Sequence, residues 1–163
     1  MKRDASTTRN PLGGDVNLGD LENQVGFVLR LAQVSVFKHL IAALEPFDLR
    51  LTDYSALLVI AANPELKQQS LGEALWIQRP NLVSIMDGLE RRGLVKRGSA
   101  PGDRRSYALT LTPEGSALLA KANAAQARHE ADIDAALGPI DKAAFLGALT
   151  RLALLSEGGE AAD

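Results

Sequence analysis

Apolar residues recur every three or four positions from about Leu21 to Leu44, which is the spacing of one face of an α-helix. A second apolar stripe, which includes Phe27, Leu31 and Phe37, runs along the same segment. A helix that is apolar on two sides has to be covered on two sides. In a chain of 163 residues, a second copy of the chain is the expected cover.

The next segment predicts three short helices. The first begins at Thr52, the second ends near Leu75, and the third runs from Pro80 to Arg92. Ser70 and Glu73 have the spacing of a capping box, which predicts that the second helix starts there. Proline at the first position of the third helix suits its fixed φ angle.

A β-hairpin is predicted directly after the third helix. Gly93 suits the left-handed residue that follows a helix end. Leu94 to Arg97 is expected to form a short strand, Gly98 to Asp103 a turn, and Ser106 to Leu111 an alternating, half-buried strand. Two short helices joined by a tight turn and followed by a hairpin form a winged helix-turn-helix.

The remainder of the chain predicts two more helices, one from the Thr112 cap to about Leu137 and one from about Asp141 to Leu155. The predicted fold is therefore mainly α with a small β-hairpin wing, in which the N- and C-terminal helices form a dimerisation region. We expect a mobile tail at 1–18, dimerisation helices at 19–46 and 113–156, a DNA-binding domain at 47–112, and an acidic tail at 157–163.

Composition excludes several classes of protein. With 46% hydrophobic residues the chain can bury a core, and the absence of cysteine excludes disulfides and zinc-thiolate sites. We find no uninterrupted run of about 18 apolar residues, so no transmembrane helix and no membrane association are expected. The N-terminus lacks the apolar segment of a secretion signal, which indicates a cytoplasmic protein.

The net charge of −2 is unevenly distributed. Between Trp76 and Tyr107 there are seven basic and three acidic residues, a local charge of +4 that leaves −6 for the rest of the chain. Phosphate binding needs a positive face and not a positive protein. Charge alone is equally compatible with a solvated surface, and the wing pattern is what favours DNA.

Exposed polar residues on the third helix and the hairpin are the candidate DNA contacts. Asn81 and Ser84 can bond to base edges in the major groove, and arginines at a hairpin tip can enter a narrow minor groove. An ordinary amphipathic helix with a solvated face remains an open alternative for the helix taken alone. The candidate set is Gln78, Arg79, Asn81, Ser84, Arg91, Lys96, Asp103, Arg104 and Arg105.

Catalytic and metal-binding patterns are not found. The sequence has no Ser-His-Asp arrangement with a supporting motif and no glycine loop that could cradle a phosphate. His39 and His129 are far apart in sequence and lack acidic partners at ligand spacing, so neither an enzyme nor a metal sensor is expected. A winged-helix module that binds protein instead of DNA remains the alternative, because the rest of the chain is acidic.

Three motifs resemble the MarR family of bacterial transcription regulators: Leu89–Val95 (LERRGLV), Asp103-Arg104-Arg105, and Leu109–Gly115 (LTLTPEG). The resemblance extends from about Leu21 to Leu155. It implies a homodimer that binds a pseudo-palindromic site in double-stranded DNA, with the third helix in the major groove. It also implies that Arg105 enters the minor groove with support from Asp103. Asn81 departs from the family, in which many members carry Ser or Thr, and this leaves the base preference open.

The resemblance further implies regulation by a small molecule, with no cofactor. Members often release DNA when a small aromatic or lipophilic anion binds between the dimer helices and the DNA-binding lobe, and repression is the commonest mode. The chain is most similar to regulators of aromatic-acid degradation, some of which answer to hydroxycinnamoyl-CoA thioesters. Candidate ligand residues are Arg30, Phe37, Lys38, His39, Phe47, Tyr54 and Trp76, and core packing remains the alternative for each aromatic residue.

Overall fold

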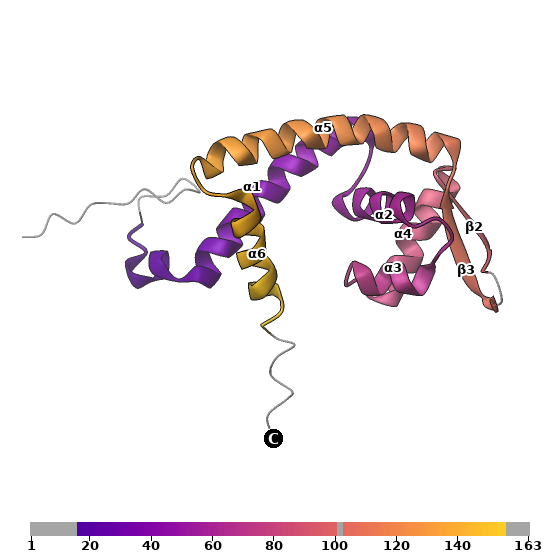
Figure 1. Cartoon of the computed structure of the whole chain (residues 1–163), viewed down its shortest axis with the longest axis horizontal. Helices are drawn as coiled ribbons and strands as arrows, with labels where there is room; N and C mark the ends of the chain where they lie inside the picture. The colour runs from indigo at the N-terminus through magenta and orange to yellow at the C-terminus, as the bar shows by residue number, and fades with distance from the viewer. Residues whose placement is uncertain (1–15, 101–102, 156–163) are drawn as a thin grey trace, which may run out of the picture. The chain divides into compact units, whose positions relative to one another are not determined.

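The computed structural model describes residues 16–100 and 103–155, with the side chains of 99–106 left out of the description. The chain divides into two compact units, Met1–Lys38 and His39–Asp163. In Figure 1 the colour follows the chain, from indigo at the start of α1 to yellow at the end of α6. The fold is mainly helical with one small antiparallel sheet, as the sequence predicts.

The N-terminal unit contains a 3-10 turn, η1 (Gly19–Asn23), and the greater part of α1 (Val25–Leu44). Most apolar side chains of α1 are exposed in the single chain, including Val25 at 65%, Val28 at 49% and Ile41 at 53%. Only Leu44 is buried among the residues of this helix, all of which the structure describes. The helix therefore lacks the cover that its two apolar stripes require.

Helix α1 is more apolar on average than its interrupted pattern suggests. By length and composition alone, Val25–Phe47 could cross a membrane, since its mean hydropathy reaches 1.5 over an 18-residue window. The prediction depends on an uninterrupted apolar run. Polar residues such as Arg30 and Lys38 interrupt the apolar run of α1, but the mean hydropathy of the window stays as high as that of a membrane-spanning helix. The apolar surface of α1 thus fits either a bilayer or another helix, and composition does not separate the two.

The second unit contains the winged helix-turn-helix. Its elements are η2 (Glu45–Phe47), α2 (Leu51–Ala62), β1 (Leu66–Lys67), α3 (Gln68–Ala74), α4 (Arg79–Arg91), β2 (Val95–Ala100) and β3 (Asp103–Leu111). Their apolar faces meet in one core, in which Leu57, Leu71, Met86 and Leu109 are almost wholly buried. This core fixes α4 and the hairpin relative to each other.

The sheet has three strands in the order β1-β3-β2, all antiparallel. Leu66 pairs with Leu109 and Val95 pairs with Leu111, so β3 is the central strand. The sequence predicts a two-stranded hairpin, and the third strand, β1, is not predicted. A strand of two residues is too short to show an alternating pattern.

The capping box predicted at Ser70 and Glu73 is wrong. Helix α3 begins at Gln68, so Ser70 lies inside it, and its N-cap residue Lys67 makes no side-chain cap bond. Glu73 accepts a hydrogen bond from Gln69 Nε2 (2.8 Å) and does not reach back to the helix start. The spacing of a capping box is also the spacing of one helical turn, so the pattern alone could not locate the start.

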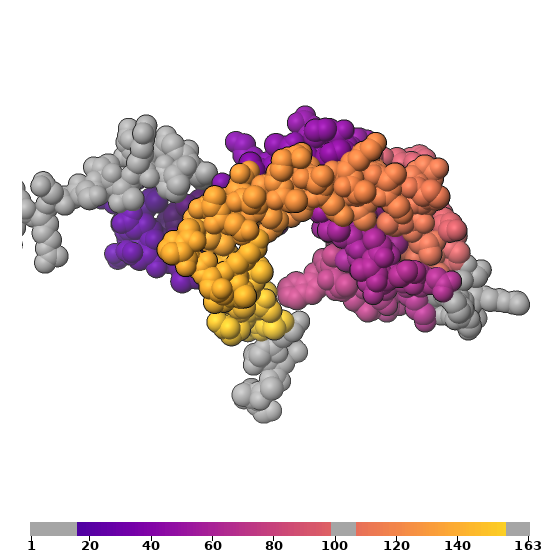
Figure 2. Space-filling model, turned by 45° about the horizontal axis from the view of Figure 1, so that its top comes forward, coloured from indigo at the N-terminus to yellow at the C-terminus, as the bar shows by residue number. Residues whose placement is uncertain are grey.

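Two further helices complete the second unit: α5 (Pro113–Leu137) and α6 (Lys142–Ala153). The predicted cap of α5 is present, because Thr112 Oγ1 accepts from the Gly115 N–H (2.9 Å). The Lys142 ammonium lies 2.7 Å from Asp134 and 2.8 Å from Glu130, which ties the start of α6 to α5. Hydrogen bonding, first to Asp134 and then to Glu130, raises the pKa of Lys142. Figure 2 shows α5 and α6 as one continuous band of surface, coloured orange to yellow.

Candidate nucleic-acid interface

Helix α4 separates an apolar side from a polar side. Leu82, Ile85, Met86 and Leu89 are buried in the core, as their spacing predicts. An α-helix fits the major groove, and exposed amide, hydroxyl and guanidinium groups can bond to base edges there. The exposed candidates on α4 and its N-cap are Gln78, Arg79, Asn81, Ser84 and Arg91.

The turn between α3 and α4 is tight. The Trp76 N–H donates to Glu73 O (3.2 Å) and the Ile77 N–H donates to Gly72 O (2.9 Å). A Cβ on Gly72 would lie 2.9 Å from Leu82 Cδ2, so glycine allows α3 to approach α4 closely. Trp76 adopts a φ of 53°, a left-handed conformation that costs a residue with a Cβ roughly 1–2 kcal/mol.

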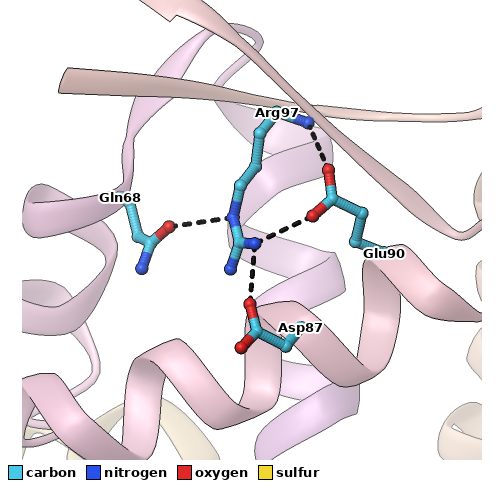
Figure 3. Close-up of polar contacts among 4 residues, drawn as sticks. All are labelled: Gln68, Asp87, Glu90 and Arg97. Carbon is cyan, nitrogen blue, oxygen red and sulfur yellow. Dashed lines mark hydrogen bonds and ion pairs between the residues drawn. The ribbon is translucent and has the colours of Figure 1, made fainter. Parts of the chain in front are cut away.

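Arg97 joins the base of the wing to both helices of the motif (Figure 3). Its guanidinium donates to Asp87 Oδ1 (2.7 Å) and Glu90 Oε2 (2.8 Å) on α4, and to Gln68 Oε1 (3.2 Å) on α3. The guanidinium carbon also lies 5.8 Å from the centre of the Tyr107 ring. With its side chain only 15% exposed, Arg97 holds β2 against α4 and is not available to a phosphate.

This cluster changes how the local charge is interpreted. Arg97, Asp87 and Glu90 carry a combined charge of −1, so the sequence count of +4 includes an arginine that the protein neutralises itself. Lys96, its neighbour on β2, is exposed and makes no ion pair among the described residues. The positive side chains that can meet DNA are therefore fewer than the sequence suggests.

Arg92 is a second arginine with a structural role. It donates through Nη1 to Asp48 O (2.6 Å) and through Nη2 to Phe47 O (3.2 Å), and its Nη2 lies 3.6 Å from Asp48 Oδ2. These are carbonyl groups at the end of η2 that no helical N–H satisfies. Arg92 therefore fastens the end of α4 to the end of η2.

The wing is the hairpin of β2 and β3. Arg97 pairs with Leu109 and Ser99 with Tyr107, and the register shifts between Ser99 and Ala100. The backbone of Asp103, Arg104 and Arg105 belongs to β3, but their side chains lie outside the described residues. Their assignment to DNA binding stays a prediction.

A surface groove of about 710 Å³ lies beside the N-terminus of α4. It is lined by residues of β1, α3, the turn, the first part of α4 and β3, among them Lys67, Gln69, Trp76, Arg79 and Tyr107. Trp76 is 67% exposed and Tyr107 is 58% exposed. The structure thus groups Trp76, a candidate ligand residue, with two candidate DNA-binding residues, Gln78 and Arg79.

The other candidate ligand residues are distributed over both units. Arg30, Phe37 and Lys38 are exposed on the part of α1 in the N-terminal unit. In the second unit, Phe47 packs against the core and Tyr54 is 5% exposed within it. The ligand site formed by all seven residues stays a prediction.

Tyr54 and His39 each contact α5 through polar groups. The Tyr54 hydroxyl donates to Asn123 Oδ1 (2.9 Å), and burial, followed by the negative charge of Glu130, raises the pKa of Tyr54. His39 Nδ1 lies 2.7 Å from His129 Nδ1, and His129 is 2% exposed. Sequence reasoning missed Asn123 and the pairing of the two histidines, because partners 69 and 90 residues apart leave no local signal.

The histidine pair has one acidic neighbour. Asp132 Oδ2 lies 3.7 Å from His39 Nε2, on the far side of the ring from His129. No group of three or more potential ligands is arranged to hold a metal ion within residues 16–100 and 103–155. The polar groups on α5 can instead orient Tyr54 and His39.

Comparison with known proteins gives a consistent result. A sequence profile of the MarR family matches residues 47–106, which span α2, α3, α4 and most of the wing. A protein from Thauera aromatica whose name assigns it to transcriptional regulation of the hcr operon is 34% identical over 136 residues. That match covers 82% of this chain and 81% of the relative.

Two similar solved structures are of a transcriptional repressor, CouR. One, bound to a 23-mer DNA duplex, is 38% identical with a TM-score of 0.81, and the match covers 86% of this chain and 99% of that one. The other, bound to p-coumaroyl-CoA, is 35% identical with a TM-score of 0.76, over 85% of this chain and 97% of that one. The similarity therefore extends well beyond residues 47–106.

Proposed function

The chain belongs to the MarR family of transcription regulators, and from this premise we propose that it is a cytoplasmic, homodimeric repressor released from DNA by an aromatic acid or its CoA thioester. The observation that carries the proposal is the near-complete match to a repressor whose structures hold a DNA duplex in one case and p-coumaroyl-CoA in the other. A regulator of this kind needs a recognition helix, a wing and a second subunit. The chain offers α4 as the recognition helix, the hairpin of β2 and β3 as the wing, and the apolar surface of α1 for the second subunit.

The proposed DNA contacts divide by their chemistry. Gln78, Asn81 and Ser84 are assigned to base edges because they present donors and acceptors on the exposed side of α4. Arg79, Arg91, Lys96 and Arg104 are assigned to phosphates, and Arg105, supported by Asp103, to the minor groove. Phosphate contacts of this number predict strong weakening of binding by salt, because each contact releases counterions from the DNA.

The dimer is assigned to the apolar surfaces of α1 and α6. Beside those of α1, Leu146 (52%) and Leu155 (71%) are exposed at the C-terminal end of the chain. A bilayer is the less suitable cover for α1, because Arg30 and Lys38 lie within the helix and each charge at a bilayer centre costs about 3 kcal/mol. Two copies would place two recognition helices on half-sites about one DNA turn apart.

The effector is assigned to the aromatic and basic residues of α1 and α2. The Tyr54 hydroxyl donates its proton to Asn123 and keeps a lone pair, which suits a phenolic O–H of the ligand. Arg30, Lys38 and His39 suit an anionic thioester. Release would follow if the ligand binds more tightly to the DNA-free conformation of the dimer, since only a difference in affinity shifts an equilibrium.

The experiment that tests this function is fluorescence anisotropy of a labelled duplex from the region upstream of the gene. The expected result is specific binding that weakens with salt and is reversed by p-coumaroyl-CoA, with CoA alone as the matched control and p-coumarate as the second candidate. Equal binding to a scrambled duplex would contradict specific regulation at that site. Specific binding that neither aromatic compound reverses would contradict the assigned effector class.

A further inference from the structure

Two helices of the DNA-binding domain end in the same backbone motif. At the end of α4, the Gly93 N–H donates to Glu90 O (2.8 Å) and the Leu94 N–H donates to Leu89 O (3.0 Å). This pair of bonds is a Schellman motif, and its penultimate residue takes a left-handed conformation that glycine adopts without cost. Gly93 has a φ of 68° and fits that rule.

At the end of α3, the corresponding residue is Trp76. The two bonds are the same, from Trp76 to Glu73 and from Ile77 to Gly72, and the φ of Trp76 is 53°. A side chain in this conformation crowds the following carbonyl, so tryptophan is disfavoured where glycine would be relaxed. The penalty is not offset by burial, since the residue is 67% exposed. Two thirds of the Trp76 surface is therefore open to a partner.

The residues around Trp76 indicate which kind of molecule its ring contacts. It lines the groove beside α4 together with two cations, Lys67 and Arg79, and with Tyr107. The recognition helix α4 begins just after Trp76, with Gln78 as its N-cap and Arg79 as its first residue. One carboxylate, Glu73, lines the groove, and it accepts a hydrogen bond from Gln69. An anionic chain with apolar sugar faces matches this lining better than an apolar peptide does.

We infer that Trp76 is an additional DNA contact, in which the indole face packs against a deoxyribose and Nε1–H donates to a backbone phosphate at the edge of each half-site. The inference rests on the proposed function, because it requires that α4 enters the major groove. It moves Trp76 from the predicted ligand residues to the DNA interface. The contact is to the backbone and adds affinity without reading a base.

Trp76 is the only tryptophan in the chain, so its fluorescence reports on this residue alone. The full-length protein is titrated with the upstream duplex while anisotropy of the labelled DNA measures binding and acrylamide quenching measures access to the indole. The expected result is loss of acrylamide quenching as the DNA binds. Specific DNA binding with unchanged quenching would overturn the inference and leave the proposed function intact. Absence of specific binding would overturn both.

Substitutions separate a DNA contact from a packing role. Trp76→Gly recreates the arrangement at Gly93, and the expected result is a higher melting temperature with operator affinity reduced roughly tenfold, equivalent to about 1.4 kcal/mol. Trp76→Phe is the matched control, and its affinity should lie between those of the wild type and Trp76→Gly, because it keeps an aromatic face and loses the N–H donor. The salt dependence of binding should be unchanged in Trp76→Gly but reduced in Arg79→Ala, because a neutral side chain releases no counterions.

Two other results for Trp76→Gly would contradict the inference. A lower melting temperature with unchanged operator affinity in Trp76→Gly would show that the indole is a packing residue and would overturn the inference. Calorimetry with p-coumaroyl-CoA provides the other comparison. Weaker binding of the thioester by Trp76→Gly, with unchanged operator affinity, would place Trp76 in the effector site and would likewise overturn the inference.

Discussion

Replacing Arg97 with Met is expected to weaken both the fold and DNA binding, although Arg97 touches no DNA in the proposed interface. Methionine keeps the apolar stem and removes the guanidinium that contacts Asp87, Glu90 and Gln68. Two carboxylates on adjacent turns of α4 would then lose their shared counter-charge. Strand β2, at the base of the wing, would lose its polar attachment to the recognition helix α4.

The magnitude follows from the geometry. A buried hydrogen bond to a charged group contributes about 1.5–3 kcal/mol, but Asp87 is 51% exposed and Glu90 is 42% exposed, so water replaces part of each bond. We therefore expect a loss of about 2 kcal/mol in the free energy of unfolding, or roughly 4–8 °C in melting temperature for a chain of this size. Stability must be compared at one protein concentration, because a dimer's stability depends on it.

The assay is urea unfolding together with operator anisotropy, with the neighbouring residue as the control. Lys96→Met should leave the free energy of unfolding within about 0.5 kcal/mol and lower the salt dependence of binding by about one counterion. Arg97→Lys keeps a charge but cannot form the same three bonds, so it should resemble Arg97→Met in stability. If Arg97→Met is as stable as the wild type, or if Arg97→Lys is fully stable, the contacts of Arg97 with Asp87, Glu90 and Gln68 do not stabilise the fold as proposed.

Three other changes test separate parts of the protein. Arg105→Ala is expected to abolish specific operator binding and leave the dimer intact, and retained nanomolar affinity would refute the role that the family resemblance implies for the wing. Phe37→Asp, on the exposed apolar side of α1, should shift the protein toward monomer by sedimentation and lower operator affinity with it; a stable dimer would count against α1 as the interface. Tyr54→Phe should cost about 1 kcal/mol near neutral pH through the lost bond to Asn123. Because the pKa of Tyr54 is raised above 10.0, its contribution is present below that pH and is lost as the pH rises through the folded-state pKa. Wild-type stability should therefore fall above pH 10.0, and less in Tyr54→Phe; equal falls in urea titrations would contradict this assignment.

Helix and strand types could be predicted from the sequence because their signals are local. The apolar spacing of α4, the Thr112 cap of α5 and Gly93 after the end of α4 each depend on residues within one or two turns. The capping box at Ser70 failed for the same reason. A pattern one turn long fits both the start and the interior of a helix, and only the structure places it inside α3.

The roles of individual charged residues could not be predicted in this way. By sequence, Arg97 is one of several arginines near the wing, and nothing distinguishes it from a phosphate contact. Its partners on α3 and α4 lie up to 29 residues away, and only the packing of β2 on those helices brings them within 3.2 Å. The sequence likewise does not predict that Trp76 adopts a left-handed backbone conformation with its ring exposed.

The order of hydrophobic and polar residues by itself determined the winged helix-turn-helix, its family and the unpartnered apolar helix, because secondary structure and motif spacing depend on neighbours in the chain. Tertiary structure alone decided which cations remain free for DNA and which serve the fold. An ion pair depends on distances of a few ångströms between residues far apart in sequence, and such distances exist only after the core of α2, α3, α4 and the hairpin has formed.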